Sequence, residues 1–235
     1  MNNELSGKVI AVTGGFGSLG MATALTAAHY GARVVLIDSA PAPGGKLPDP
    51  LAGSLVLGGV DLASEEAAKQ AVAEIAAKYG ELSGLVNVAG AFRWATVQEG
   101  ELETWDDLFR VNLKTAVTAS KAALPLLTTQ EAPRIVNIGA GAANKATAGM
   151  GPYAASKAAV ARLTEALAEE FKESGLTVNA VLPSIIDTPR NRADMPDADI
   201  SRWVKPEAIA EVIAFLLSRR ADAITGALIP VVGRV

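Results

Sequence analysis

The stretch "KVIAVTGGFGSLG" (8–20) carries an apolar, β-branched run directly into a turn with four glycines. The alanine-rich segment that follows predicts a helix near 18–30. A strand that turns through glycines into a helix lets the backbone approach a pyrophosphate, which the free amides at the helix N-terminus bind. Such a turn is weak evidence by itself, so the pattern of the remaining chain decides its meaning.

Short apolar runs alternate with long alanine-rich segments along the chain. The predicted strands are 8–14, 33–38, 54–60, 84–90, 134–139, 177–183 and 226–232. The predicted helices lie near 18–30, 64–79, 104–127, 153–174 and 206–219. Runs that are apolar almost throughout are typical of parallel strands covered on both faces. The alternation therefore predicts a single α/β domain over 1–235, a Rossmann-type doubly wound parallel sheet of about seven strands with helices on both faces.

One crossover departs from this alternation. The segment "SAPAPGGKLPDPLAG" (39–53) holds four prolines and three glycines. Both residues are unfavourable inside a helix, by about 3 and about 1 kcal/mol respectively. We therefore expect a loop between the second and third strands.

Composition narrows the classes of function. The net charge of −4 and the pI near 5.2 argue against a nucleic-acid or anionic-membrane partner, because both need clustered basic residues. No apolar run reaches the roughly 18–20 residues that span a bilayer, and the N-terminus lacks a signal-peptide pattern. The chain has no cysteine, which excludes disulfides, thiol nucleophiles and thiolate metal sites. We expect a cytoplasmic protein that acts on a small molecule and has no metal site.

Asp38 stands at the end of the second predicted strand, about 20 residues after the glycine turn. An acid in this position accepts hydrogen bonds from the adenosine ribose hydroxyls. Its charge repels a 2′-phosphate, and no arginine or lysine adjoins it. The cofactor prediction is NAD(H) in preference to NADP(H).

Tyr153 and Lys157 are four residues apart and share one face of a predicted helix. A free phenol has a pKa of about 10, which suits proton transfer at neutral pH poorly. A nearby ammonium and an oxidised nicotinamide favour the phenolate, so we expect a lowered pKa for Tyr153. Tyr153 can then exchange a proton with a substrate as hydride moves to or from a nicotinamide.

Taken in order, these motifs resemble those of the short-chain dehydrogenase/reductase family over essentially the whole chain. "TGGFGSLG" (13–20) is similar to that family's T-G-x-x-x-G-x-G turn, with Ser18 in place of the middle glycine. "DL" (61–62), "NVAG" (87–90) and "PSIIDT" (183–188) are similar to its adenine, strand-end and nicotinamide segments. The resemblance implies cofactor contacts at Gly14, Phe16, Gly17, Ser18, Leu19, Asp38, Asp61, Leu62, Asn87, Ala89, Gly90, Tyr153, Lys157, Pro183, Ile186 and Thr188.

The resemblance also implies the catalytic residues. Tyr153 is the acid/base, Lys157 binds the nicotinamide ribose, and Asn112 holds a water in a proton relay. The family's serine belongs thirteen residues before the tyrosine, where this chain has Ala140. Loss of one donor to the substrate oxygen costs on the order of 10²–10³ in rate.

Three explanations of Ala140 stay open. Another group could replace the hydroxyl, and the weak candidates are Asn144, Thr147 and Ser184. The substrate could be reactive enough without it, or catalysis could be lost. Ser156 is not a replacement, because its helix position gives it no reason to point at the substrate oxygen.

A closer resemblance bears on this choice. The loop 139–153 and the stretch 180–203 are similar to those of the serine-less dihydropteridine reductases, a branch of the same family that reduces an electron-poor quinonoid imine with NADH. Asn87, Asn112 and "YAASK" (153–157) are more like ordinary short-chain dehydrogenases. The resemblance implies an activated C=N or C=O substrate. The alternatives are a simple ketone or secondary alcohol and, from another class, a catalytically silent NAD(H)-binding sensor or scaffold.

The last expectations concern the substrate pocket and the oligomeric state. The region 184–205, which includes Trp203, is predicted to fold over the substrate as a flap. Arg93, Trp94, Arg190 and Arg192 either line the pocket or are solvated loop residues. The helices near 104–127 and 153–174 carry more apolar residues than one face needs, which predicts a homodimer or homotetramer.

Overall fold

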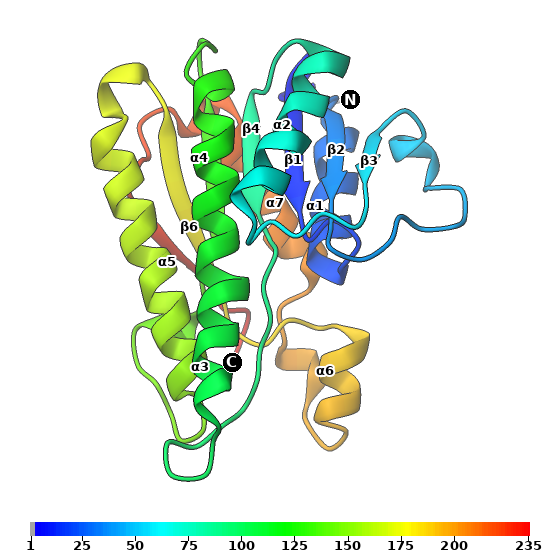
Figure 1. The fold of residues 1–235 in the computed structure, drawn as a ribbon. Helices are drawn as coiled ribbons and strands as arrows, with labels where there is room; N and C mark the ends of the chain where they lie inside the picture. The colour runs from blue at the N-terminus through cyan, green and yellow to red at the C-terminus, as the bar shows by residue number, and fades with distance from the viewer. Residues whose placement is uncertain (1–2) are drawn as a thin grey trace.

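The computed structural model describes residues 3–235, and its centre is one sheet of seven parallel strands (Figure 1). The spatial order is β3-β2-β1-β4-β5-β6-β7. The strands are β1 (Val9–Thr13), β2 (Arg33–Ile37), β3 (Leu55–Leu57), β4 (Gly84–Asn87), β5 (Arg134–Ile138), β6 (Thr177–Pro183) and β7 (Leu228–Val231). All seven predicted strands are confirmed. The third, fourth and seventh are each at least three residues shorter than predicted. After β3 the N–H of Gly59 donates to the Ala40 carbonyl, so the chain has left the sheet there.

Helices cover both faces of this sheet (Figure 1). One hydrophobic core lies under α1 and α7, and a second lies under α2, α4 and α5. The α-helices are α1 (Ser18–His29), α2 (Glu65–Tyr79), α3 (Leu102–Leu108), α4 (Thr115–Leu127), α5 (Gly151–Glu170), α6 (Pro189–Asp194) and α7 (Pro206–Leu217). This is the predicted doubly wound arrangement. Within residues 3–235, no helix is both long and apolar enough to cross a membrane.

The predicted helix over 104–127 is wrong in one respect. A π-helical segment, η2 (Phe109–Lys114), separates α3 from α4. The wider turn brings Asn112 to a buried position, where its amide binds the backbone of Ala91. π-Bulges interrupt helices in this way, often at functional sites. The expected loop at 39–53 is confirmed, with only a short 3₁₀ turn at Asp49–Leu51.

The strand order reverses between β1 and β4. The chain runs outward through β1, β2 and β3, and then returns to place β4 on the other side of β1. The register pairs Thr13 with Asn87 at the carboxyl ends of the two strands. In open α/β sheets ligands bind in the crevice beside such a reversal, so the topology singles out this edge as a site.

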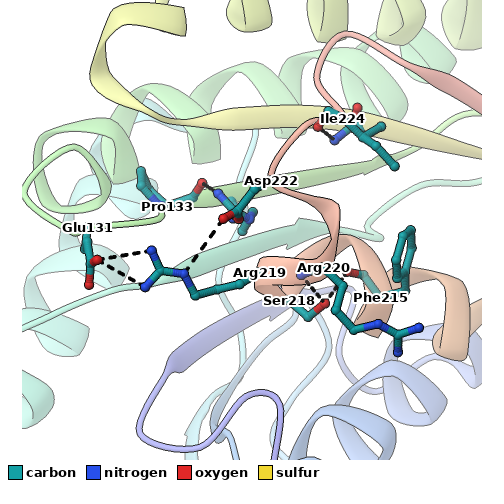
Figure 2. A network of polar contacts seen from close by, with 10 residues as sticks. Glu131, Pro133, Phe215, Ser218, Arg219, Arg220, Asp222 and Ile224 are labelled. Carbon is teal, nitrogen blue, oxygen red and sulfur yellow. Dashed lines mark hydrogen bonds and ion pairs between the residues drawn. The ribbon is translucent and has the colours of Figure 1, made fainter.

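A cluster of charged residues lies at the amino ends of the strands, away from this crevice. The buried guanidinium of Arg134, at the start of β5, pairs with Asp222. Arg219 bridges Glu131 at 3.1 Å and Asp222 at 3.8 Å, as Figure 2 shows. Burial lowers the pKa of Arg134, and the Asp222 carboxylate opposes that shift. Asp222 is half exposed, so the pair joins a buried guanidinium to a carboxylate at the surface. Removal of Asp222 would leave the buried guanidinium of Arg134 without its charged partner.

The glycine turn packs against its own helix. A Cβ on Gly20, in the first turn of α1, would overlap the carbonyl oxygen of Gly14 and approach the Cα of Gly15 to 2.9 Å. Only a residue without a side chain lets α1 begin this close to the end of β1. The amides of the first turn therefore lie directly beside the crevice.

Gly20→Ala is expected to destabilise the protein, because the methyl group must displace backbone. Overpacking of this kind costs about 1–3 kcal/mol. Thermal and urea unfolding measure the change. Gly45→Ala is the matched control, because a Cβ there meets nothing within 4 Å. Equal stability of the two variants would contradict the close approach.

Candidate active site

Thr13 joins the two sides of the crevice. Its hydroxyl oxygen accepts hydrogen bonds from the backbone N–H groups of Val88 and Ala89, each at 3.1 Å. The last residue of β1 thus fixes the segment that leaves β4. Sequence reasoning quoted Thr13 but assigned it no role; its position at the end of a buried strand, just before the first glycine, is the signal that could have found it.

Asp38 is directed into the glycine turn. Its Oδ2 accepts from the N–H of Phe16 at 2.9 Å, and its Oδ1 accepts from the N–H of Ala40 at 3.0 Å. Each oxygen keeps a further lone pair for a ribose hydroxyl. In residues 3–235 no lysine or arginine pairs with Asp38. The structure thus brings Asp38 and the turn residues Gly14, Phe16, Gly17, Ser18 and Leu19 to one place, around the start of α1.

Asp61 and Leu62 follow β3 and are already engaged with the protein. Asp61 accepts from the N–H of Ala63 at 3.0 Å and pairs with Arg110 of η2. The Leu62 side chain is buried, and its carbonyl accepts from the Thr118 hydroxyl. Within residues 3–235 the backbone N–H of Leu62 has no hydrogen-bond partner.

The Asn87 side chain lies in the interior and not in the crevice. Its Nδ2 donates to Ser120 of α4 at 3.1 Å and to Asn137 of β5 at 2.8 Å. Asn137 in turn donates to Thr164 of α5 at 2.9 Å. Of the predicted segment 87–90, the backbone at Ala89 and Gly90 reaches the crevice, whereas the Asn87 amide ties the sheet to its helices.

Gly90 faces the reacting groups. A Cβ on Gly90 would stand 2.7 Å from Oδ1 of Asn112 and 3.3 Å from Nζ of Lys157. Both side chains therefore approach Gly90, although they come from η2 and α5. The fold thus brings Gly90, Asn112 and Lys157 close together.

Lys157 and Tyr153 lie on the same face of α5. Nζ of Lys157 is buried, donates to the Ile138 carbonyl at 2.8 Å, and lies 6.0 Å from the centre of the Tyr153 ring. Phe92 packs against the Tyr153 ring in a T-shaped arrangement, with 5.0 Å between ring centres. Sequence reasoning missed Phe92, which is 44% exposed.

Burial sets the charge of this pair. It raises the pKa of Tyr153 to about 12 and lowers the pKa of Lys157 to about 8. The predicted lowering of the phenol pKa is therefore not met by the chain's own groups. Loss of hydration disfavours the phenolate more than an ammonium 6.0 Å from the ring favours it.

The structure places each residue that was considered as a replacement for the missing serine hydroxyl. Ala140 is buried just after β5. Ser184 donates to the Val232 carbonyl at 2.6 Å, so its proton is already used. Asn144 and Thr147 are exposed on the loop. Ser156 points into the protein, toward Asn112.

The segment 184–205 contains the short helix α6, which projects away from the sheet (Figure 1). Thr188 accepts from the Asn191 N–H at 3.1 Å and caps this helix, and Asn191 donates to the Ile186 carbonyl at 2.8 Å. A bridge between Ile186 and Val204 and the buried ring of Trp203 tie the base of the segment to the body. Pro183, Ile186 and Thr188 therefore line the far side of the carboxyl edge, where β6 ends.

The arginines of the expected pocket each have an acidic partner. Arg93 pairs with Asp107 at 2.7 Å, Arg190 with Asp194 at 3.6 Å, and Arg192 with Asp187 at 2.6 Å. A cavity of about 180 Å³ lies beside the first pair, lined by Ala91, Arg93, Asp107, Leu108, Arg110 and Val111. Trp94 is 62% exposed and covers Gly149. All three arginine side chains are more than half exposed, and each is paired with a carboxylate.

Comparisons with known proteins agree with this geometry. The family model described as short chain dehydrogenase matches residues 8–199. A curated relative, 2-(S)-hydroxypropyl-CoM dehydrogenase 3 of Xanthobacter autotrophicus, is 32% identical over 99% of this chain and 98% of its own length. A second protein of that organism, named inactive 2-(S)-hydroxypropyl-CoM dehydrogenase 2, is 35% identical over 89% of this chain and 97% of its own.

A solved structure matches as well. Carveol dehydrogenase from Mycobacterium avium, in complex with NAD, has a TM-score of 0.85 and 25% identity, with 98% of each chain covered. Like the family model, these matches extend over the strand-order reversal with its glycine turn. The chain belongs to the short-chain dehydrogenase/reductase family and is an oxidoreductase that uses a nicotinamide cofactor.

Proposed function

We propose that this oxidoreductase is an NAD(H)-dependent reductase of an activated C=N or C=O substrate. Tyr153 is the proton donor, Lys157 sets its charge environment and binds the nicotinamide ribose, and Asn112 supports both. The bound cofactor supplies the hydride. The observation that carries the proposal is Ala140: a methyl group stands where a donor to the substrate atom is expected, beside an otherwise complete Tyr153–Lys157 pair.

The residues of the crevice fit a dinucleotide. The first turn of α1 carries no acidic side chain, so its free amides can face a pyrophosphate. The two lone pairs left on Asp38 suit the adenosine ribose hydroxyls, and the free N–H of Leu62 suits adenine. The negative charge of Asp38 supports NAD(H) over NADP(H).

The protonation state of Tyr153 favours reduction. With a pKa of about 12 the phenol holds its proton at neutral pH, and Lys157 with a pKa of about 8 is largely an ammonium there. Reduction places a hydride on the substrate carbon and the Tyr153 proton on its nitrogen or oxygen. The tyrosinate left behind regains a proton from solvent. An electron-poor substrate needs little further polarisation, which removes the need for the donor absent at Ala140.

Two alternatives keep specific support. A simple ketone or secondary alcohol as substrate is supported by Asn87, Asn112 and the "YAASK" motif. A catalytically silent NAD(H)-binding protein is supported by Ala140 and by the existence of a relative named as inactive. Retention of Tyr153, Lys157 and Asn112 together favours an enzyme, because cofactor binding by itself does not need the phenol.

Other expectations stay predictions. Phe109 and Val117 are 36% and 37% exposed on η2 and α4, which supports a homodimer or homotetramer formed through this helix face. Closure of the segment 184–205 over the substrate, a single domain over 1–235 and a cytoplasmic location also stay predictions.

Tyr153→Phe is expected to lower turnover at least about 100-fold, because it removes the proton donor. NADH oxidation is measured with quinonoid dihydropterin, a quinone and a simple ketone. NADH binding, followed by fluorescence, should change little. Tyr79→Phe at the end of α2, which keeps the partly buried ring, is the control and should leave turnover unchanged.

The panel separates the candidate functions. Fastest turnover on the dihydropterin or quinone supports an activated substrate, and fastest turnover on the ketone supports the ordinary dehydrogenase. Tight NADH binding without turnover on any compound would move the assignment to the silent binding protein.

Ala140→Ser tests why the donor is missing. The new hydroxyl should raise the kcat for simple ketones by about 10-fold or more, because one added donor can stabilise the developing charge. The kcat for the activated substrate should stay within about twofold. An equal gain on both classes would contradict substrate activation as the explanation of Ala140.

Asp38→Asn tests the cofactor preference. It should lower the ratio of kcat/KM for NADH to that for NADPH by about 10-fold or more, because it removes a negative charge close to the 2′-phosphate. Steady-state assays with both cofactors give the ratio. Asp49→Asn removes the same charge from the neighbouring loop and should leave it unchanged. An unchanged ratio in both variants would exclude Asp38 as the selective group.

A further inference from the structure

The Asn112 side-chain amide makes three hydrogen bonds inside the protein. Its Oδ1 accepts from the N–H of Ala91 at 2.8 Å, and its Nδ2 donates to the Ala91 carbonyl at 3.0 Å and to Oγ of Ser156 at 2.9 Å. Both amide protons are thus used inside the protein. The side chain can offer a water only the second lone pair of Oδ1. Its main task in this geometry is to hold three segments together.

Ser156 completes this arrangement from α5. Its side chain is fully buried, and its hydroxyl donates to the Tyr153 carbonyl at 2.8 Å. Because the hydroxyl proton is spent on that carbonyl, a lone pair of Oγ faces the Asn112 amide. A continuous chain of hydrogen bonds therefore runs from Ala91 through Asn112 and Ser156 to the backbone of Tyr153.

The same chain bears on Lys157. Oδ1 of Asn112 and Nζ of Lys157 approach a single point beside Gly90, at 2.7 Å and 3.3 Å from where its Cβ would be. A shift of Asn112 therefore changes the surroundings of the buried ammonium. The π-helical segment η2 puts Asn112 within reach, and the hydroxyl of Ser156 supplies its only bond to α5 among the described residues.

We propose that Ser156 is a positioning residue for hydride transfer: through Asn112 it holds the Gly90–Ala91 wall against the Tyr153–Lys157 pair. This inference rests on the proposed function for its rate effect. Sequence reasoning considered Ser156 only as a replacement for the missing hydroxyl and excluded it there, because its helix position gives it no reason to point at the substrate oxygen. Ser156 acts by aligning the groups around the substrate. Misplacement of these groups by about 1 Å can lower the rate by as much as 100-fold.

Thr164 provides a matched control on the same helix. Its buried hydroxyl accepts from Nδ2 of Asn137 at 2.9 Å and donates to the Val160 carbonyl at 2.8 Å. This repeats the chemistry of Ser156, with an asparagine amide on one side and a helix carbonyl on the other. No hydrogen bond joins Thr164 to Asn112, Lys157 or Tyr153 within residues 3–235. Ser156→Ala and Thr164→Val each leave one buried amide proton unpaired, so both should lower the melting temperature.

The test compares these variants in kcat, KM and NADH affinity, with the panel compound that the wild type turns over fastest. Ser156→Ala should lower kcat by about 10- to 100-fold, with KM and NADH affinity within about threefold of wild type. Thr164→Val should keep the wild-type kcat. In the Asn112→Ala background, Ser156→Ala should lower kcat no further, because both residues act through one contact. Equal kcat losses in Ser156→Ala and Thr164→Val, or additive effects with Asn112→Ala, would overturn the proposal.

A structural readout separates this inference from the proposed function. In a crystal structure of Ser156→Ala with NADH, the Asn112 amide should leave hydrogen-bond distance of Ala91. An Asn112 amide that stays in place overturns the positioning role even if no compound of the panel is reduced. If the wild type turns over none of the compounds, that result contradicts the proposed function only. The position of Asn112 in the Ser156→Ala structure still tests the positioning role.

Discussion

The hydroxyl of Thr13 makes the contact on which the site depends. It binds two backbone amides of the segment after β4, at the point where the strand order reverses. Parallel pairing brings the carboxyl ends of all strands to one edge, but pairing alone does not fix the loops that leave them. The Thr13 hydroxyl fixes the segment that leaves β4, and a few residues further on the backbone of Ala91 binds the Asn112 amide.

Burial is the second constraint, and it acts on charge. Lys157 is held inside by the Ile138 carbonyl, and its pKa falls to about 8. The phenol of Tyr153 moves in the opposite direction, to about 12, for the same reason. The sequence predicts that the Lys157 ammonium favours the phenolate of Tyr153. In the folded chain the ammonium lies near a phenol that keeps its proton. Such a phenol is protonated at neutral pH, but it gives up its proton less readily than a free phenol does.

The interrupted helix shows how local irregularity serves the site. A regular helix over 102–127 would carry Asn112 on a face set by the 3.6-residue period. The π-helical segment η2 changes that phase, and the Asn112 amide reaches both Ala91 and Ser156. The same hydrogen-bond pattern occurs twice on α5. The buried hydroxyl of Ser156 accepts from the Asn112 amide, and that of Thr164 accepts from the Asn137 amide.

The sequence by itself determined the seven strands, the loop at 39–53 and the residues gathered at the crevice. Apolar runs, proline clusters and four-residue spacing are local properties that a single chain displays directly. Tertiary structure decided the rest. The Asn87 amide turned inward because Ser120 and Asn137 offer it partners, the helix over 104–127 acquired a π turn around Asn112, and burial set the protonation of Tyr153 and Lys157. Each of these depends on atoms far away in the sequence, and so does the hydrogen bond that gives Ser156 its place.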